Sequence, residues 1–227
     1  MVPSSVDVER ILRALKATPE ETEEISSLAR VANTEYQNWR ASLRRGLHHK
    51  QAELATIEAR SSTLRYFLPA MITGLLQTPE YARASLASLP GDHTRALMRR
   101  FERQSILYDT GKNFTFILTE QALRWPLCPR GEMSVQLERI AALAELPNVR
   151  IGVLPLEADT VSEGPLSTFT IYDKTLATVE TFTGALLIRS RKDVALYDET
   201  FGLFEEHALF GSAARDFVRQ AAETFRG

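Results

Sequence analysis

Charged side chains in the middle of the chain have the types and spacing of a small polar binding pocket. Glu120 and Arg124 are four residues apart, which places them on one face if the segment is helical. Glu180 is a charge within an otherwise apolar and threonine-rich stretch. Because ligands commonly bind beside the ends of strands, we expect Glu120, Arg124, Glu180 and Gln77 to line a pocket for an effector or a partner. The alternative is a local structural pair of Glu120 with Arg124, which we favour, and an edge strand that leaves Glu180 in solvent.

The segment His48-His49-Lys50 contains a histidine and a lysine at the spacing used by phospholipase-D-like phosphodiesterases. The segment is predicted to be helical, no aspartate follows at the spacing of those enzymes, and the motif occurs once. Adjacent histidines on a helix point about 100° apart, which makes them poor joint metal ligands. The common motifs of phosphate loops, serine hydrolases and zinc proteases are absent. We expect no catalytic residue, metal or cofactor, and keep a phosphodiesterase or nuclease-like enzyme as an alternative.

The composition narrows the class of protein further. The chain has 227 residues, of which 44% are hydrophobic and 25% charged, and its net charge of −2 is ordinary for a soluble globular protein. Proteins that bind nucleic acid through many phosphates normally carry an excess of Lys and Arg, which this chain as a whole lacks. The one cysteine, Cys128, rules out an internal disulfide. With no apolar stretch near the roughly 20 residues of a membrane span, we expect a cytoplasmic protein that is not inserted in a membrane.

Helical patterns dominate the first half of the chain. Apolar residues recur at helical spacing in residues 6–17, and residues 18–21 have the composition of a capping box that begins a second helix. The pattern from Tyr36 to Tyr66 is again helical, with Gly46 as an interruption. Further helices are predicted from Thr78-Pro79-Glu80 to about residue 89 and over residues 93–108.

Strand patterns appear in the second half. Strands are predicted over residues 114–118, 149–154, 166–172, 176–181 and 186–188. A helix over residues 132–146 follows the first strand, and two helices, about 192–209 and 212–226, come last. The sequence therefore predicts an α+β fold, in which a helical N-terminal half is followed by a small mixed sheet of about five strands packed with helices.

Residues 28–40 imitate a DNA-binding helix-turn-helix. A polar Asn33-Thr34 turn precedes Gln37, Asn38 and Arg40, whose side chains could reach base edges. The alternative is a surface helix, which we favour because the turn lacks a glycine and too few helices precede it.

Several short sequences of the chain occur together, in this order, in one protein family. They are Gly74–Arg83, Arg103–Leu107, Glu120–Arg124, Gln136-Leu137 with Pro147–Pro155, Gly164-Pro165 and Val179-Glu180. Over roughly residues 55–225 the chain resembles the C-terminal domain of unknown function of actinomycete (Streptomyces-type) transcription regulators with an XRE-type helix-turn-helix. The resemblance implies a regulatory domain attached to a DNA-binding head, a small acidic partner protein encoded nearby, and no reaction.

The resemblance also predicts how the chain divides. Residues 1–54 are expected to be a helical linker or a remnant of the DNA-binding domain, and residues 55–227 the regulatory domain. A complete N-terminal helix-turn-helix is absent from the sequence, so we expect either a naturally headless relative or a truncated chain.

The most specific of the shared sequences has two interpretations. Its residues could form a rigid junction that transmits motion between the two halves, or a well-specified corner between a loop and a helix, which we favour. The residues concerned are Gly74, Gln77, Thr78, Pro79 and Tyr81. The neighbouring Met71, Ile72, Leu75 and Leu76 are then expected in the core.

Taken together, these features predict the ligand-sensing or partner-binding domain of a bacterial helix-turn-helix transcription regulator. DNA contact is expected only through the missing head, and a homodimer is a candidate assembly. The alternative is a standalone antitoxin-like interaction protein that binds a small acidic partner without contacting DNA.

Overall fold

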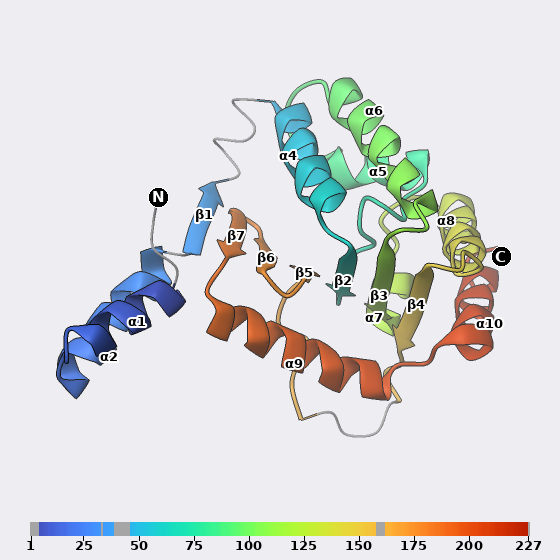
Figure 1. The fold of residues 1–227 in the computed structure, drawn as a ribbon. Coiled ribbons are helices and arrows are strands. Elements are labelled where there is room, and N and C mark those ends of the chain that lie inside the picture. The colour runs from blue at the N-terminus through green and yellow to red at the C-terminus, as the bar shows by residue number, and fades with distance from the viewer. Residues whose placement is uncertain (1–4, 33, 39–45, 158–161, 227) are drawn as a thin grey trace.

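The computed structural model describes residues 5–32, 34–38, 46–157 and 162–226, which form an α+β fold on one mixed sheet (Figure 1). Among these residues the sheet has seven strands, in the order β1-β7-β6-β5-β2-β3-β4. Strands β2, β3 and β4 are parallel, and the other neighbours are antiparallel. The bounds are β1 Thr34–Asn38, β2 Thr63–Leu68, β3 Asn113–Thr119, β4 Val149–Leu154, β5 Phe169–Tyr172, β6 Leu176–Thr181 and β7 Gly184–Ile188. The predicted α+β class is confirmed, with seven strands in place of about five.

Helices cover both faces of the sheet (Figure 1). On one face lie α4 Leu47–Arg60, α5 Pro79–Leu86, α6 Thr94–Arg103, α8 Arg130–Leu143 and α10 Gly211–Glu223, with the 3-10 helix Gln104–Tyr108 and the short helix α7 Glu120–Arg124 at the strand ends. On the other face lies α9 Arg191–His207. Two further helices, α1 Ser5–Ala14 and α2 Pro19–Ala32, form a hairpin outside the sheet beside β1.

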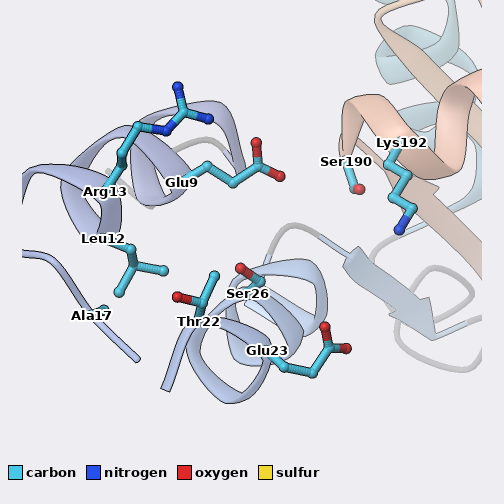
Figure 2. Close-up of a pocket in the computed structure, with 9 residues that line it drawn as sticks. All are labelled: Glu9, Leu12, Arg13, Ala17, Thr22, Glu23, Ser26, Ser190 and Lys192. Carbon is cyan, nitrogen blue, oxygen red and sulfur yellow. The ribbon is translucent and has the colours of Figure 1, made fainter. Parts of the chain in front are cut away.

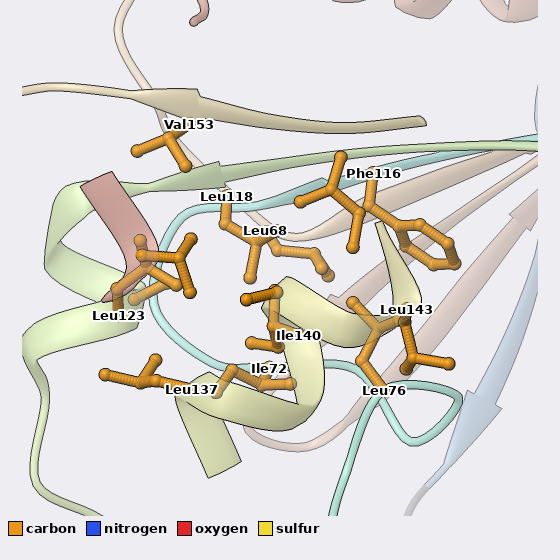
Figure 3. Close-up of a cluster of buried hydrophobic side chains, with 14 of the residues drawn as sticks. Leu68, Ile72, Leu76, Phe116, Leu118, Leu123, Leu137, Ile140, Leu143 and Val153 are labelled. Carbon is orange, nitrogen blue, oxygen red and sulfur yellow. The ribbon is translucent and has the colours of Figure 1, made fainter. Parts of the chain in front are cut away.

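The larger core lies between the sheet and the helices of the first face (Figure 3). Alternate residues of the parallel strands point into it because side chains alternate along a strand. They pack against apolar side chains of α8 and of the loop after β2, which bury them completely or nearly so. The labelled members are Leu68, Ile72, Leu76, Phe116, Leu118, Leu123, Leu137, Ile140, Leu143 and Val153.

The second core joins the sheet to α9 and is rich in aromatic rings. Phe67 of β2 stacks on Phe204 of α9, with ring centroids 4.1 Å apart and planes 7° apart. Phe169 of β5 lies against Phe201 and Tyr197 of the same helix. This packing fixes α9, whose first residue follows the N-cap Ser190.

Two of the strands correct the sequence prediction. The helix predicted from Tyr36 to Tyr66 is wrong at both ends, where the structure has β1 and β2, and right only for α4. β1 pairs with β7, a strand about 150 residues later, so its extended form depends on a partner that a local pattern does not reveal. β2 is an interior strand of the sheet, between β5 and β3, and its short, mainly apolar run cannot be told from a helix by periodicity alone.

The same strand bears on the helix-turn-helix interpretation. Gln37 and Asn38, the residues expected to reach base edges, lie in β1 and pair with Ala185 and Gly184 of β7. Neither a surface helix nor a recognition helix therefore continues past α2 in the described part of this segment, and Arg40 lies outside the described residues.

Within the described residues, no helix has both the length and the apolar character needed to cross a bilayer.

Candidate functional site

The predicted junction motif is a corner between a loop and α5, and buried polar side chains hold it. The Gln77 side chain is buried, and its Nε2 donates to the Ile72 carbonyl oxygen at 2.8 Å. Thr78 caps α5 by accepting a hydrogen bond from the Tyr81 amide, and Pro79 is the first residue of the helix. The Tyr81 hydroxyl in turn accepts from the Ile72 amide at 3.3 Å. These contacts support the interpretation of the motif as a well-specified corner.

Two more glutamines fasten the corner to neighbouring helices. Gln136 of α8 accepts from the Thr78 amide at 2.7 Å and donates to the Leu76 carbonyl oxygen at 2.9 Å. Gln104, which follows α6, donates to the Gly74 carbonyl oxygen at 2.8 Å. Both side chains are buried, so their hydrogen bonds satisfy backbone groups that water does not reach. The two glutamine side chains therefore bind backbone groups of the same chain.

Two arginines of α6 pass over Gly74. A Cβ atom at Gly74 would lie 3.2 Å from Cδ of Arg100 and 3.3 Å from Nη2 of Arg103, so the absent side chain makes room for both. The Arg100 guanidinium donates to Oε1 of Gln77 at 2.6 Å and to Oγ of Ser85 at 2.9 Å. Burial, together with the neighbouring Arg103 charge, lowers the pKa of Arg100 to about 10.

Arg103 forms a buried ion pair with Glu58 of α4. Nε of Arg103 lies 2.9 Å from Oε2 of Glu58, and the two side chains are 6% and 1% exposed. Arg103 also donates to Gln51 of α4 at 2.5 Å, while the Tyr66 hydroxyl of β2 donates to the other Glu58 oxygen at 3.1 Å. Burial raises the pKa of Glu58, and the Arg103 charge opposes that rise. This group of five residues, Gln51, Glu58, Tyr66, Arg100 and Arg103, is called the arginine cluster below.

A small cavity lies under α4 close to the arginine cluster. It measures about 30 Å³, the volume that one water molecule occupies in the liquid, and Lys50 and Glu180 are among its lining residues. Burial lowers the pKa of Lys50, and the negative charge of Glu180 opposes that change. The Glu180 charge therefore partly offsets the lowering of the pKa of Lys50 in α4 and of Arg100 in α6. The cavity that Glu180 and Lys50 line is too small for an effector.

Glu120 and Arg124 form a separate pair at the end of β3. Nε of Arg124 lies 2.6 Å from Oε1 of Glu120, and the Leu156 amide donates to Oε2 of Glu120 at 3.0 Å. Burial alone would raise the pKa of Glu120, but the Leu156 amide and the Arg124 charge lower it overall. Because both carboxylate oxygens have partners, the local structural pair is the interpretation that the geometry supports.

A ligand-sized groove lies between the α1–α2 hairpin and the beginning of α9 (Figure 2). Its volume is about 470 Å³, within the range of small-molecule sites in proteins. The lining mixes charged, hydroxyl and apolar side chains from both ends of the chain. They are Glu9, Leu12, Arg13, Ala17, Thr22, Glu23, Ser26, Ser190 and Lys192.

The structure distributes the predicted pocket residues over two places. Gln77 accepts a hydrogen bond from Arg100, and the nearby Glu180 charge partly offsets the lowering of the Arg100 pKa by burial. In the described part of the chain, no hydrogen bond or ion pair links Glu120 or Arg124 to either of them. An effector pocket formed by these four residues stays a prediction.

The sequence reasoning missed the buried ion pair and the groove. Arg103 begins one of the family-like sequences, and this could have marked it as a residue of interest. Glu58 lies in a helix with many polar residues, so the sequence does not distinguish it from its neighbours. The groove joins residues from opposite ends of the chain, which no local pattern reveals. Among the described residues, no group of three His, Cys, Asp or Glu side chains could hold a metal ion.

The sequence model of a domain of unknown function, DUF5753, matches residues 51–220. The chain belongs to the DUF5753 family. The DUF5753 match runs from α4 into α10, so it covers the arginine cluster and the junction corner and leaves the α1–α2 hairpin outside. It bears out the predicted domain of unknown function. No curated protein matches the sequence.

Solved structures with a similar arrangement differ strongly in sequence from this DUF5753 protein. NucT from Helicobacter pylori is 8% identical, with a TM-score of 0.47 over 78% of this chain and 97% of that one. TrmBL2, an archaeal chromatin protein, is 13% identical, with a TM-score of 0.39 over 88% and 65%. Nuc from Salmonella typhimurium, a phospholipase D family member, is 11% identical, with a TM-score of 0.39 over 71% and 90%. Likeness at this level carries no argument about function.

Proposed function

We propose that this DUF5753 protein is the regulatory domain of a bacterial helix-turn-helix transcription regulator, and that a small effector acts in the groove between the α1–α2 hairpin and α9. The groove carries the proposal, because a ligand of suitable size would contact two parts that fold on separate cores. The hairpin has its own core of Val8, Leu12 and Ala29. The family-like sequences from Gly74 to Glu180 support the assignment to transcription regulators.

A ligand in this groove would regulate by favouring one position of the hairpin. A ligand shifts an equilibrium between two arrangements only by the difference in its affinity for them. Contacts to Arg13 and Ser26 on the hairpin and to Lys192 on α9 exist together only when the two parts are correctly placed, so bound ligand would stabilise that placement. Arg13 and Lys192 suit a ligand with a negative charge, and Glu9 and Glu23 suit hydroxyl or amine groups.

The described polar clusters support a regulatory domain better than a catalytic one. Arg103, Glu58 and Gln77 are buried and bonded to one another or to the backbone. Buried ion pairs add little stability compared with apolar packing, and in some proteins they define one unique arrangement of the core. Here such a pair fixes α4, the helix that follows the segment leading from the hairpin.

A thermal-shift screen with a groove-blocking variant tests the effector site. The chain is screened against nucleotides and small metabolites, alone and as Ser26→Trp, which places a large ring in the groove. Ser27→Trp is the matched control, since Ser27 is exposed and does not line the groove. Compounds that raise the melting temperature of the native chain and of Ser27→Trp should lose their effect on Ser26→Trp. Compounds that stabilise all three proteins equally, or a screen without any stabilising compound, would contradict an effector in this groove.

A further inference from the structure

β1 joins the α1–α2 hairpin to residues 46–157 and 162–226, which are called the body below. The hairpin ends at Ala32, and β1 begins at Thr34 on the edge of the described sheet (Figure 1). Among the described residues, no cluster of buried apolar side chains combines the hairpin with the body, because the hairpin core contains residues of its own two helices alone. The pairing of β1 with β7 is therefore the main attachment of the hairpin that the structure describes.

β1 buries little of its own surface. Of its side chains, Thr34 and Gln37 are half-buried, and Glu35 and Tyr36 are exposed, whereas all four residues of β5 are buried. Glu35 forms an ion pair with Arg189 at 3.4 Å, but both side chains are exposed, so the pair adds little. Such a strand is held mainly by backbone hydrogen bonds, whose net contribution is small because the released groups bond to water instead. Releasing β1 should therefore cost less than releasing an interior strand.

β7 keeps its place in the sheet without β1. It pairs with β6 along its whole length. Ala185, Leu187 and Ile188 of β7 are buried, and Ile188 belongs to the core under α9. These contacts lie within the body, so the body stays folded when β1 leaves.

The fit between β1 and β7 is nevertheless specific. A Cβ atom at Gly184 of β7 would collide with the Gln37 carbonyl oxygen and stand 2.9 Å from Cε2 of Tyr36, and the three nearest atoms all belong to β1. The backbone of Gly184 is not in the left-handed region, so glycine is needed here for space alone. The Tyr36 hydroxyl donates to the Thr183 carbonyl oxygen at 2.8 Å. The turn before β7 thus leaves a place free that β1 fills.

We propose that β1 is a docking strand, which leaves β7 and takes the hairpin with it while the body stays folded. The two walls of the groove extend from this pair of strands. α2 ends just before Thr34, and Ile188, the partner of Thr34, comes just before the groove residues Ser190 and Lys192. Release would separate the walls, so an effector bound between them would favour docking. This last step rests on the proposed function, whereas the release of β1 does not.

Hydrogen exchange of the full chain, measured by mass spectrometry without any ligand, tests the release. In the native chain, amides of β1 should be at least about tenfold less protected than those of β5. Gly184→Ala should lower the protection of β1 at least about tenfold further and leave β2 and β3 unchanged, because the added methyl group collides with β1. Gly202→Ala is the matched control, since a Cβ atom there meets nothing within 4 Å.

A reversible lock should produce the opposite change. Gln37 lies opposite Ala185, and both line the small cavity under α4, so their side chains share one face of the sheet. In the double variant Gln37→Cys with Ala185→Cys, the disulfide should raise the protection of β1 at least about tenfold. The reduced form of the same protein is the control and should exchange as the native chain does.

Three results would overturn the proposal. They are a native β1 as well protected as β5, a Gly184→Ala variant in which β1 is unchanged or β2 and β3 lose as much protection as β1, and a formed disulfide that leaves β1 unchanged. Because no ligand is present, these measurements can succeed when the effector screen fails, and fail when it succeeds.

Discussion

Single residues at the junction corner explain why the most specific sequence of the chain has its composition. Gly74 is needed because two guanidinium groups cross its backbone, and Gln77 because its amide bridges the loop and Arg100. The sequence alone indicated a corner at these residues, since a threonine followed by proline is a helix start. It could not indicate Arg100 as the partner, which comes from another helix.

Replacing Gly74 with alanine should destabilise the protein. The added methyl group would stand 3.2 to 3.3 Å from the two arginines, so they would have to shift, and we expect a loss of about 1 to 2 kcal/mol in the free energy of unfolding. Gly202→Ala is the control, because a Cβ there meets nothing within 4 Å and lies inside α9, where alanine should stabilise by up to about 1 kcal/mol. Urea unfolding measures both. Equal effects of the two changes would show that Gly74 is not required for space.

Removing only one partner of the buried ion pair between Glu58 and Arg103 should destabilise the protein strongly. Glu58→Leu leaves the Arg103 charge without its buried partner, and we expect a loss of about 3 kcal/mol in the free energy of unfolding. The double variant with Arg103→Met should recover most of that loss, because it removes both charges. A double-variant cycle in urea measures the coupling. Additive losses would mean that the two side chains do not act as a pair.

At the scale of elements, Lys112 fixes the end of α4. Its ammonium group donates to the carbonyl oxygens of Glu58, Ala59 and Ser61 at 3.1, 2.8 and 2.6 Å. These carbonyls lie in the last turn and at the C-cap of α4, where a positive charge is favourable, and the Glu58 oxygen also accepts the Ser61 amide. Lys112→Met should therefore cost about 1 to 2 kcal/mol and speed hydrogen exchange in the last turn of α4. Unchanged exchange in that turn would contradict this role.

The elements also show how far sequence reasoning reaches. The helix at residues 132–146 and the strand at 149–154 were predicted well, because each satisfies its pattern locally. β1 was missed because its extended form depends on pairing with β7. The Glu120–Arg124 pair could be predicted from spacing, whereas Glu58 and Arg103 meet only through the packing of α4 on α6.

At the scale of the molecule, the hairpin should be the least stable part of the described chain. Its core has three buried residues, whereas the body is built on two large clusters. Local opening costs less where few apolar contacts are lost, so amides of α1 and α2 should exchange faster than those of β2 and β3. Mass spectrometry of hydrogen exchange measures this. Equal protection of hairpin and body would show that the hairpin is a firm part of the domain.

The measurement that tests the central claim most directly is hydrogen exchange with and without a compound that passes the groove screen. The claim is that one ligand contacts the hairpin and the body together. The expected result is added protection in α1, in α2 and in the first turn of α9, absent from Ser26→Trp. Protection confined to one side of the groove, or located only around Glu120 and Arg124, would contradict it.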